Sequence, residues 1–163
     1  MSRDDFLEGM SRAAQTVSVV TTDGPAGKAG VTVSAMCSVS ADPPIVLACI
    51  HHESNSVPLI RQNSVFCVNV LLDTMEGVSN VFANFTDARG AAKFDCADWD
   101  TGKTGAPILQ DALAAFDCHV EEIHRAGSHF IFLGTVADTI LGHGNPLIYG
   151  SRSYGSPAFF TND

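Results

Sequence analysis

The sequence lacks the segments that mark membrane and secreted proteins. Its longest apolar runs, such as residues 43–50, are far shorter than the roughly 20 residues that a membrane-spanning helix needs. The start, Met1-Ser2-Arg3-Asp4-Asp5, has no basic stretch leading into an apolar one, as a signal peptide would. The five cysteines are odd in number and form no CxxC pair, which argues against a disulfide framework or a zinc ribbon. These absences favour a cytoplasmic protein.

Positive charge is also scarce. The nine Lys and Arg residues stand against 18 Asp and Glu residues, which gives a formal net charge of -9. A surface this acidic repels nucleic-acid backbones and anionic membranes, so neither is expected as a partner. A local basic pocket for one small phosphate is still compatible, because net charge does not describe a single site. The 163 residues, 45% of them hydrophobic, predict one globular domain over residues 1–163.

Several catalytic and nucleotide-binding motifs are missing from the sequence. It contains no HExxH, no GxSxG, no GxGxxG after a strand and no GxxxxGK[ST]. The pair His51-His52 suggests a metal site, but adjacent residues of a strand point to opposite faces of the sheet. Solvated or packing histidines are the favoured interpretation, and no metal site is predicted.

Strand-like segments dominate what is present. β-branched and apolar residues predict strands at residues 16–22, 29–34, 45–50, 65–72, 112–123, 129–140 and 146–149. Helical spacing predicts short helices near residues 6–14 and near residues 75–85. Capping residues and Pro58 predict another that begins at Ser56. Residues 45–50 are expected to be fully buried, residues 87–105 to form an irregular surface segment, and Gly134 to lie at a bulge. The pattern predicts a closed or nearly closed antiparallel barrel.

One of these segments, residues 112–123, alternates in polarity. Its apolar side chains fall on one face, and the polar side chains Asp117, His119 and Glu121 fall on the other. This pattern is typical of a half-buried antiparallel strand whose polar face meets solvent.

Two segments are rich in hydroxyl groups. Residues 30–40 carry small and hydroxyl side chains and no charge, which suits either a flat polar ligand or an edge strand that faces solvent. Residues 54–56, Ser-Asn-Ser, precede a predicted helix. Hydroxyls and free N–H groups there can bind an anion, or Ser54 or Ser56 can simply cap the helix.

Two further features involve single ionisable side chains. His129 enters an apolar strand just after a turn, where histidine can be structural or functional. Arg152 lies near Tyr149 and Tyr154, so it can bind a ligand or pack on an aromatic face.

The order and spacing of these segments resemble the short-chain flavin reductase family, whose members fold as an FMN-binding split β-barrel. The resemblance covers nearly the whole chain. It is carried by Gly30-Val31-Thr32-Val33-Ser34-Ala35, Ser38-Val39-Ser40-Ala41-Asp42-Pro43-Pro44, Phe66-Cys67-Val68-Asn69-Val70-Leu71, Phe82-Ala83, Lys93-Phe94, Gly127-Ser128-His129, Phe132-Leu133-Gly134-Thr135-Val136 and Pro146-Leu147-Ile148-Tyr149. One departure is Ser128, where many relatives carry an acidic residue before the histidine.

The resemblance implies a mainly β fold, an antiparallel, Greek-key-like split barrel with a few short helices. It also implies roles for individual residues. The isoalloxazine edge is expected at Thr32, Val33, Ser34 and Ala35, with Ser38 within reach. The flavin phosphate is expected at Ser54, Asn55 and Ser56, with Lys93, Phe94 and Arg89 completing its pocket. His129 is the candidate for contacting the nicotinamide or tuning the flavin, and Arg152 and Tyr154 are further candidate contacts.

The function implied by the resemblance is reduction of FMN or FAD by NADH or NADPH in a homodimer. The reduced flavin would go to a partner monooxygenase. Two alternatives stay open. The protein could keep its flavin and reduce another acceptor, such as a corrinoid cobalt, or it could bind flavin without catalysis.

Overall fold

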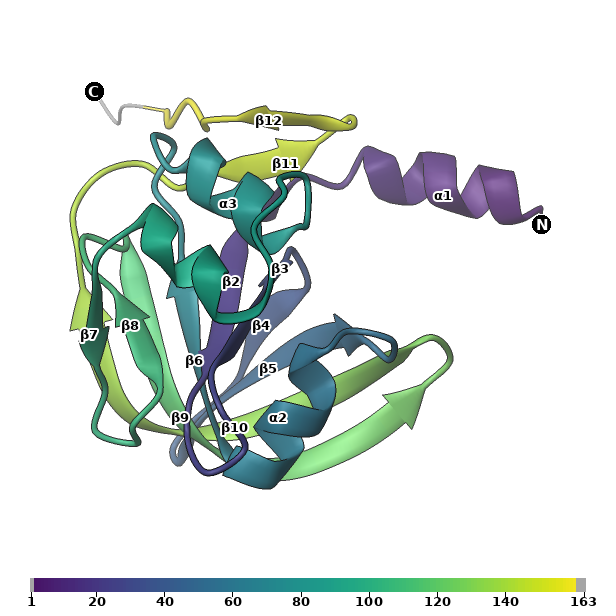
Figure 1. Ribbon diagram of the computed structural model, residues 1–163. Coiled ribbons are helices and arrows are strands. Elements are labelled where there is room, and N and C mark those ends of the chain that lie inside the picture. Colours follow the sequence, from purple (N-terminus) through teal and green to yellow (C-terminus); the bar gives the residue numbers. More distant parts are fainter. Residues whose placement is uncertain (1, 161–163) are drawn as a thin grey trace.

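A seven-stranded antiparallel sheet organises the computed structural model, which describes residues 2–160. Its strands follow the order β3-β2-β6-β9-β10-β5-β4 (Figure 1). Their bounds are β2 Ser18–Thr22, β3 Ala29–Val33, β4 Met36–Ala41, β5 Pro44–His51, β6 Val65–Val70, β9 Ala114–Ala126 and β10 His129–Leu141.

The connection between β3 and β4 closes this sheet into a barrel. The two strands stand at opposite edges of the hydrogen-bonded order, yet only Ser34 and Ala35 separate them in the chain. So short a link reaches roughly 10 Å at most, so the two edges must lie close together. The sheet therefore curls into a barrel with an open seam between β3 and β4. The expected antiparallel split barrel is confirmed.

Strand β6 shows how the interior is filled. Phe66 and Val68 belong to the barrel core, together with residues such as Phe132 of β10. Val65 and Cys67 pack on the other face against the hairpin of β7 (Trp99–Thr101) and β8 (Pro107–Leu109). Because both faces are covered, every residue of β6 is buried.

The predicted bulge at Gly134 is confirmed by a register shift between Leu133 and Gly134, where β10 pairs with β9. A Cβ atom on Gly134 would lie 2.4 Å from Cζ of Phe66. Glycine is therefore required there by the close approach of the Phe66 ring.

The helices are short, and they differ in how they contact the barrel. Helix α2 (Ser56–Asn63) places Val57 and Ile60 in the barrel core and covers one end of the barrel. Helix α3 (Glu76–Phe82) and the 3-10 helix η1 (Gly90–Cys96) pack through Phe82 and Phe94 in a second apolar cluster. Helix α1 (Arg3–Ser11) projects from the body and buries no residue (Figure 1). Among residues 2–160, no helix has the length and apolarity needed to cross a bilayer.

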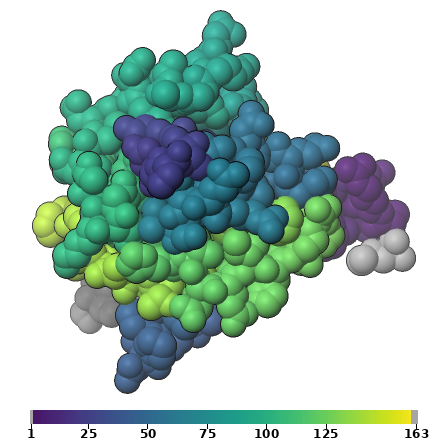
Figure 2. All heavy atoms as spheres, turned by 60° about the horizontal axis from the view of Figure 1, so that its bottom comes forward, coloured from purple at the N-terminus to yellow at the C-terminus, as the bar shows by residue number. Residues whose placement is uncertain are grey.

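The β2–β3 turn is fastened to α2 by one side chain. Asn63 donates to the carbonyl of Gly27 at 2.9 Å and accepts from the backbone N–H of Ala26 at 2.9 Å. Figure 2 shows this turn, in dark purple, beside the blue surface of α2. The contact fastens the β2–β3 turn to the C-terminal end of α2.

A small sheet lies outside the barrel and contains β1 (Gln15–Thr16), β11 (Ile148–Gly150) and β12 (Ser153–Gly155). The strand expected at residues 16–22 is thus two strands, β1 and β2, separated at Val17. Strand β12 was not predicted, because its three residues carry no alternating pattern.

Three sequence-based expectations are corrected. Strand β5 is not fully buried: Val46, Ala48 and Ile50 are, but the residues between them are only partly covered, because one face alone meets the core. The segment 87–105 is not irregular throughout, since it contains η1 and β7.

The third correction concerns Asp117, which is buried rather than facing solvent. Its carboxylate accepts hydrogen bonds from the backbone N–H and the hydroxyl of Thr104, at 2.9 and 2.5 Å. The β7–β8 hairpin covers this face of β9, and no local pattern in the sequence predicts that burial.

Candidate functional site

A cavity of about 370 Å³ lies between β3, the N-terminus of α2 and the segment that joins α3 to η1. We call it the α2 cavity. It brings together five of the candidate residues, from two separate parts of the chain. Its lining consists of Ala29, Gly30, Val31, His51, Glu53, Ser54, Asn55, Ser56, Asn84, Arg89, Gly90 and Lys93.

The N-terminus of α2 faces this cavity and has polar side chains that do not cap the helix. Asn55 is the N-cap residue, but its side chain makes no capping hydrogen bond. The hydroxyl of Ser54 accepts from the backbone N–H of Ser56 at 3.3 Å, within a local turn. Simple N-capping by Ser54 or Ser56 therefore does not account for all three residues. Helix N-termini carry partial positive charge and favour anions.

Lys93 is the most informative residue of the α2 cavity. Lys93 is only 8% exposed, and its ammonium group forms no ion pair within residues 2–160. Burial lowers the pKa of Lys93, and the nearby Arg89 lowers it further. Burying an unpaired charge is unfavourable, so a lysine in this position is well suited to an anionic ligand.

Arg89 adds a second positive charge at the cavity. Its guanidinium donates to the carbonyls of Thr86 and Ala88, which holds it against its own loop. Two residues of the same segment, Asn84 and Gly90, adopt positive φ angles of 65° and 57°. These turns bend the chain so that both basic side chains line the cavity.

Phe94 supports the site rather than lining it. Its ring packs edge-on against Phe82 and Trp99, with ring centroids 5.1 and 4.9 Å apart. Gly30 lies against the same cluster, since a Cβ atom there would lie 2.5 Å from Cε1 of Phe82. This aromatic packing positions η1, and with it Lys93, beside β3.

The residues expected at the isoalloxazine edge continue from the cavity along β3. Thr32 donates its hydroxyl to the carbonyl of Ser79 at 2.7 Å, and Val33 is buried. Ser34 and Ala35 form the link at the seam of the barrel, and Ser38 lies exposed on β4. The structure therefore places these candidates in a row that leads from the α2 cavity to the seam.

His129 lies close to the cavity but does not line it. It begins β10 directly opposite His51 of β5, and the two rings meet edge-on with centroids 5.1 Å apart. Its Nδ1 lies 3.0 Å from the hydroxyl of Ser128. Burial lowers the pKa of His129, and the neighbouring His51 and His52 lower it further.

Arg152 and Tyr154 are not brought to the α2 cavity. Arg152 donates to Glu8 of α1 at 3.0 Å. The hydroxyl of Tyr154 lies 2.8 Å from that of Ser79 and 3.2 Å from the side-chain oxygen of Asn80. Their roles as flavin contacts stay predictions.

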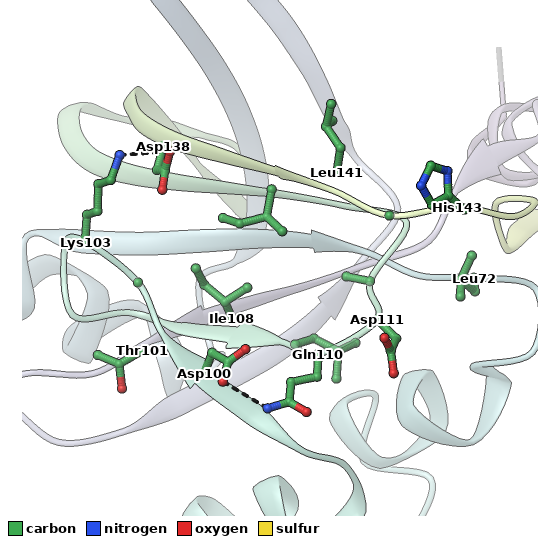
Figure 3. Close-up of a pocket in the computed structure, with 15 residues that line it drawn as sticks. Leu72, Asp100, Thr101, Lys103, Ile108, Gln110, Asp111, Asp138, Leu141 and His143 are labelled. Atoms are coloured by element: carbon green, nitrogen blue, oxygen red, sulfur yellow. Dashed lines mark hydrogen bonds and ion pairs between the residues drawn. The ribbon is translucent and has the colours of Figure 1, made fainter.

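A second, larger cavity of about 760 Å³ lies beside the β7–β8 hairpin (Figure 3). We call it the hairpin cavity; none of the candidate residues lines it. Its only lysine, Lys103, is paired with Asp138 at 3.0 Å, while Asp100 and Asp111 add further negative charge. An anionic ligand is therefore disfavoured here despite the greater volume.

Several residues of the α2 cavity were not predicted from the sequence. Ala29 was expected only as the start of a strand, Gly30 and Val31 only as part of a motif, and His51 only as a possible metal ligand. Asn84 and Gly90 carry no signal in the sequence, because their place at the cavity depends on the path of the loop. His51 could have been found, since it precedes the Ser54–Ser56 segment by only three residues.

Comparisons with known proteins point to one family. Residues 10–158 match a family model described as a flavin reductase like domain. The protein "FMN reductase (NADH) RutF" of Agrobacterium fabrum is 38% identical over 151 residues, which cover 92% of this chain and 86% of that protein.

Solved structures are similar over nearly the whole chain. BorF, the flavin reductase component of a bacterial two-component tryptophan halogenase, has a TM-score of 0.87 at 29% identity, covering 95% of this chain and 98% of its own. The NADH:FAD oxidoreductase SgcE6 of Streptomyces globisporus C-1027, in complex with NAD and FAD fragments, has a TM-score of 0.87 at 26% identity, covering 96% and 93%.

Proposed function

We propose that this chain, which belongs to the flavin reductase like domain family, reduces FMN with a hydride from NADH. The single observation that carries the proposal is the buried, unpaired Lys93 beside the N-terminus of α2. A phosphate monoester fits this donor set, because it supplies the counterion that the buried Lys93 lacks. FMN is preferred to FAD because the similar RutF protein is named an FMN reductase that uses NADH.

The residues of the α2 cavity would hold the phosphate. Lys93 and Arg89 would neutralise its charge, and Ser54, Asn55 and Ser56 would donate hydrogen bonds from side chains and from the helix N-terminus. Because Lys93 is buried, its interaction with an anion is less screened by water than that of a surface lysine. The cavity would thus anchor one end of the cofactor.

The ring would extend along β3 toward the seam. Thr32 to Ala35 would bind its edge with backbone groups, and Ser38 lies on the opposite side of the seam. Flavin itself supplies the redox chemistry when bound. The chain's task is to hold the reactants in contact and to limit water, which requires no nucleophile and no metal ligand.

His129 is proposed to contact the nicotinamide or to tune the flavin. It lies beside the cavity, and its ring contacts that of His51, which lines the cavity. Its lowered pKa favours a neutral ring, which can both donate and accept a hydrogen bond.

A homodimer and a partner oxygenase belong to the same proposal. Apolar side chains of α1, Phe6, Leu7 and Met10, are exposed on a helix that leaves the body of the protein. A second copy of this chain is the proposed cover for them. The similarity to BorF, a reductase component of a two-component system, supports delivery of reduced flavin to an oxygenase. A cytoplasmic location stays a prediction.

The test is oxidation of the nicotinamide, followed at its absorbance with each pairing of NADH or NADPH with FMN or FAD. Fast oxidation with NADH and FMN is expected. No oxidation with any pairing would exclude a reductase. A yellow protein that survives dialysis and is not bleached by NADH would indicate a flavin carrier instead.

A further inference from the structure

Three histidines form a cluster at the edge of the α2 cavity. The ring of His51 lies 4.7 Å from that of His52 and 5.1 Å from that of His129, measured between centroids. The cluster joins the end of β5 to the start of β10, where His51 and His129 are direct cross-strand partners. Of the three, only His51 lines the cavity that also holds Lys93 and Arg89.

The hydrogen bonds distinguish these rings. Nδ1 of His52 donates to the carbonyl of Ser128 at 2.8 Å, so this ring links the end of β5 to the start of β10. Nδ1 of His51 instead accepts from the backbone N–H of Glu53 at 3.3 Å. The neutral His51 ring therefore carries its proton on Nε2, and Nδ1 is the atom that a second proton would join.

Charged groups face His51 from three elements. The carboxylate of Glu53 lies 4.0 Å from Nδ1, and this side chain is largely exposed. Lys93 and Arg89 line the same cavity as His51, and the rings of His52 and His129 adjoin it in the cluster. Basic groups therefore outnumber carboxylates around His51, which suits an anionic ligand.

We propose that His51 is a third cationic group of the phosphate site, and that it gains a proton when the phosphate binds. The inference rests on the proposed function and extends it to a residue that the motifs did not select. A bound phosphate places negative charge in the cavity that His51 lines, so a proton on Nδ1 becomes more favourable in its presence. By linkage, acidification through the histidine range strengthens the contribution of His51 to phosphate binding.

The lowered pKa of His129 agrees with this arrangement. Part of its shift comes from repulsion by His51 and His52, which indicates that the cluster resists more than one positive charge. Of the three histidines, only His51 lines the cavity, so only its charge can act directly on a ligand there.

The experiment compares FMN with riboflavin, which lacks the phosphate, in the wild type and in His51→Gln at pH 6 and pH 8.5. Because a phosphate monoester itself titrates near pH 6, the ratio of the variant Kd to the wild-type Kd is the readout. For FMN we expect about a five- to tenfold ratio at pH 6 and less than about twofold at pH 8.5. For riboflavin the ratio stays near one at both values.

The matched control is His143→Gln, because His143 lines the hairpin cavity instead. It should leave both ratios near one. Calorimetry near pH 7, in two buffers of different ionisation enthalpy, should show proton uptake when FMN binds to the wild type and less uptake in His51→Gln.

The outcomes separate the two proposals. An FMN ratio that is the same at both pH values, or proton uptake that His51→Gln does not reduce, would overturn the role of His51 and leave the reductase proposal intact. If neither flavin binds at either pH, the proposed function fails and this inference fails with it.

Discussion

The two cavities of this molecule differ in the burial and the ion pairing of the lysine that lines each of them. In the hairpin cavity, Lys103 is exposed and paired with Asp138 at 3.0 Å. In the α2 cavity, Lys93 is buried and unpaired within residues 2–160. A surface ion pair contributes little to stability, whereas a buried unpaired charge reduces it. The smaller cavity, and not the larger one, is therefore organised to receive an anion.

A second difference lies in the role of the carboxylates. Beneath the hairpin cavity, buried Asp117 holds Thr104 and so fixes the β7–β8 hairpin. In the α2 cavity the one carboxylate, that of Glu53, is exposed. Near the hairpin cavity a buried carboxylate therefore stabilises the fold, whereas in the α2 cavity basic groups are placed to bind a ligand.

The largest expected effect is on stability, from Asp117→Ala. The change leaves the partly buried N–H and hydroxyl of Thr104 without their acceptor and empties the buried position of Asp117, which should lower the free energy of unfolding by about 3 kcal/mol. Urea denaturation measures it, with exposed Asp100→Ala as the control, expected within about 0.5 kcal/mol of the wild type. FMN affinity should be unchanged. A loss below about 1 kcal/mol would show that Asp117 does not fasten the hairpin.

The next effect is on binding, from Lys93→Met. Loss of the buried cation should weaken FMN binding by about 2 kcal/mol, or roughly 30-fold, while riboflavin binding changes little. The melting temperature should stay the same or rise, because the buried unpaired charge is gone. Lys103→Met should leave FMN affinity unchanged. Equal losses from the two lysine variants would abolish the distinction between the cavities.

A smaller effect on binding is expected from Ser56→Ala. Ser56 is 3% exposed and lines the α2 cavity, so losing its hydroxyl should weaken FMN binding by about 1–2 kcal/mol. Fluorescence titration with FMN and with riboflavin measures it. The loss should disappear with riboflavin, and unchanged FMN affinity would clear Ser56 of this role.

The smallest effect is the pH dependence of stability that comes from His129. Its pKa is lowered in the folded protein, so the unfolded chain binds more protons as the pH falls past the ordinary value of 6.5. Stability is therefore full above that value and declines below it. His129→Gln should reduce the decline between pH 7 and 5 by at most a few tenths of a kcal/mol, because His129 is exposed and screened. Thermal melts across this range check the difference, and an unchanged slope would contradict it.

Much of the barrel could be predicted because its signals are local. The β-branched segment at residues 18–22, the alternation in β9 and the glycine at position 134 each report the backbone that they form. Ser56 at the start of α2 was predicted for the same reason, since capping residues and proline act within one helical turn. The burial of Asp117 and of Lys93 was not predicted, because it depends on segments far away in the chain.

The strand and helix segments, the acidic surface and the hydroxyl-rich ends of β3 and α2 follow from composition and from near neighbours in the chain. Long-range contacts set which lysine is left without a counterion. They also bring His51 and Lys93 to one cavity, while Arg152 lies elsewhere. Desolvation and charge pairing are set by groups that come together when the barrel closes, and closure joins residues that no local pattern connects.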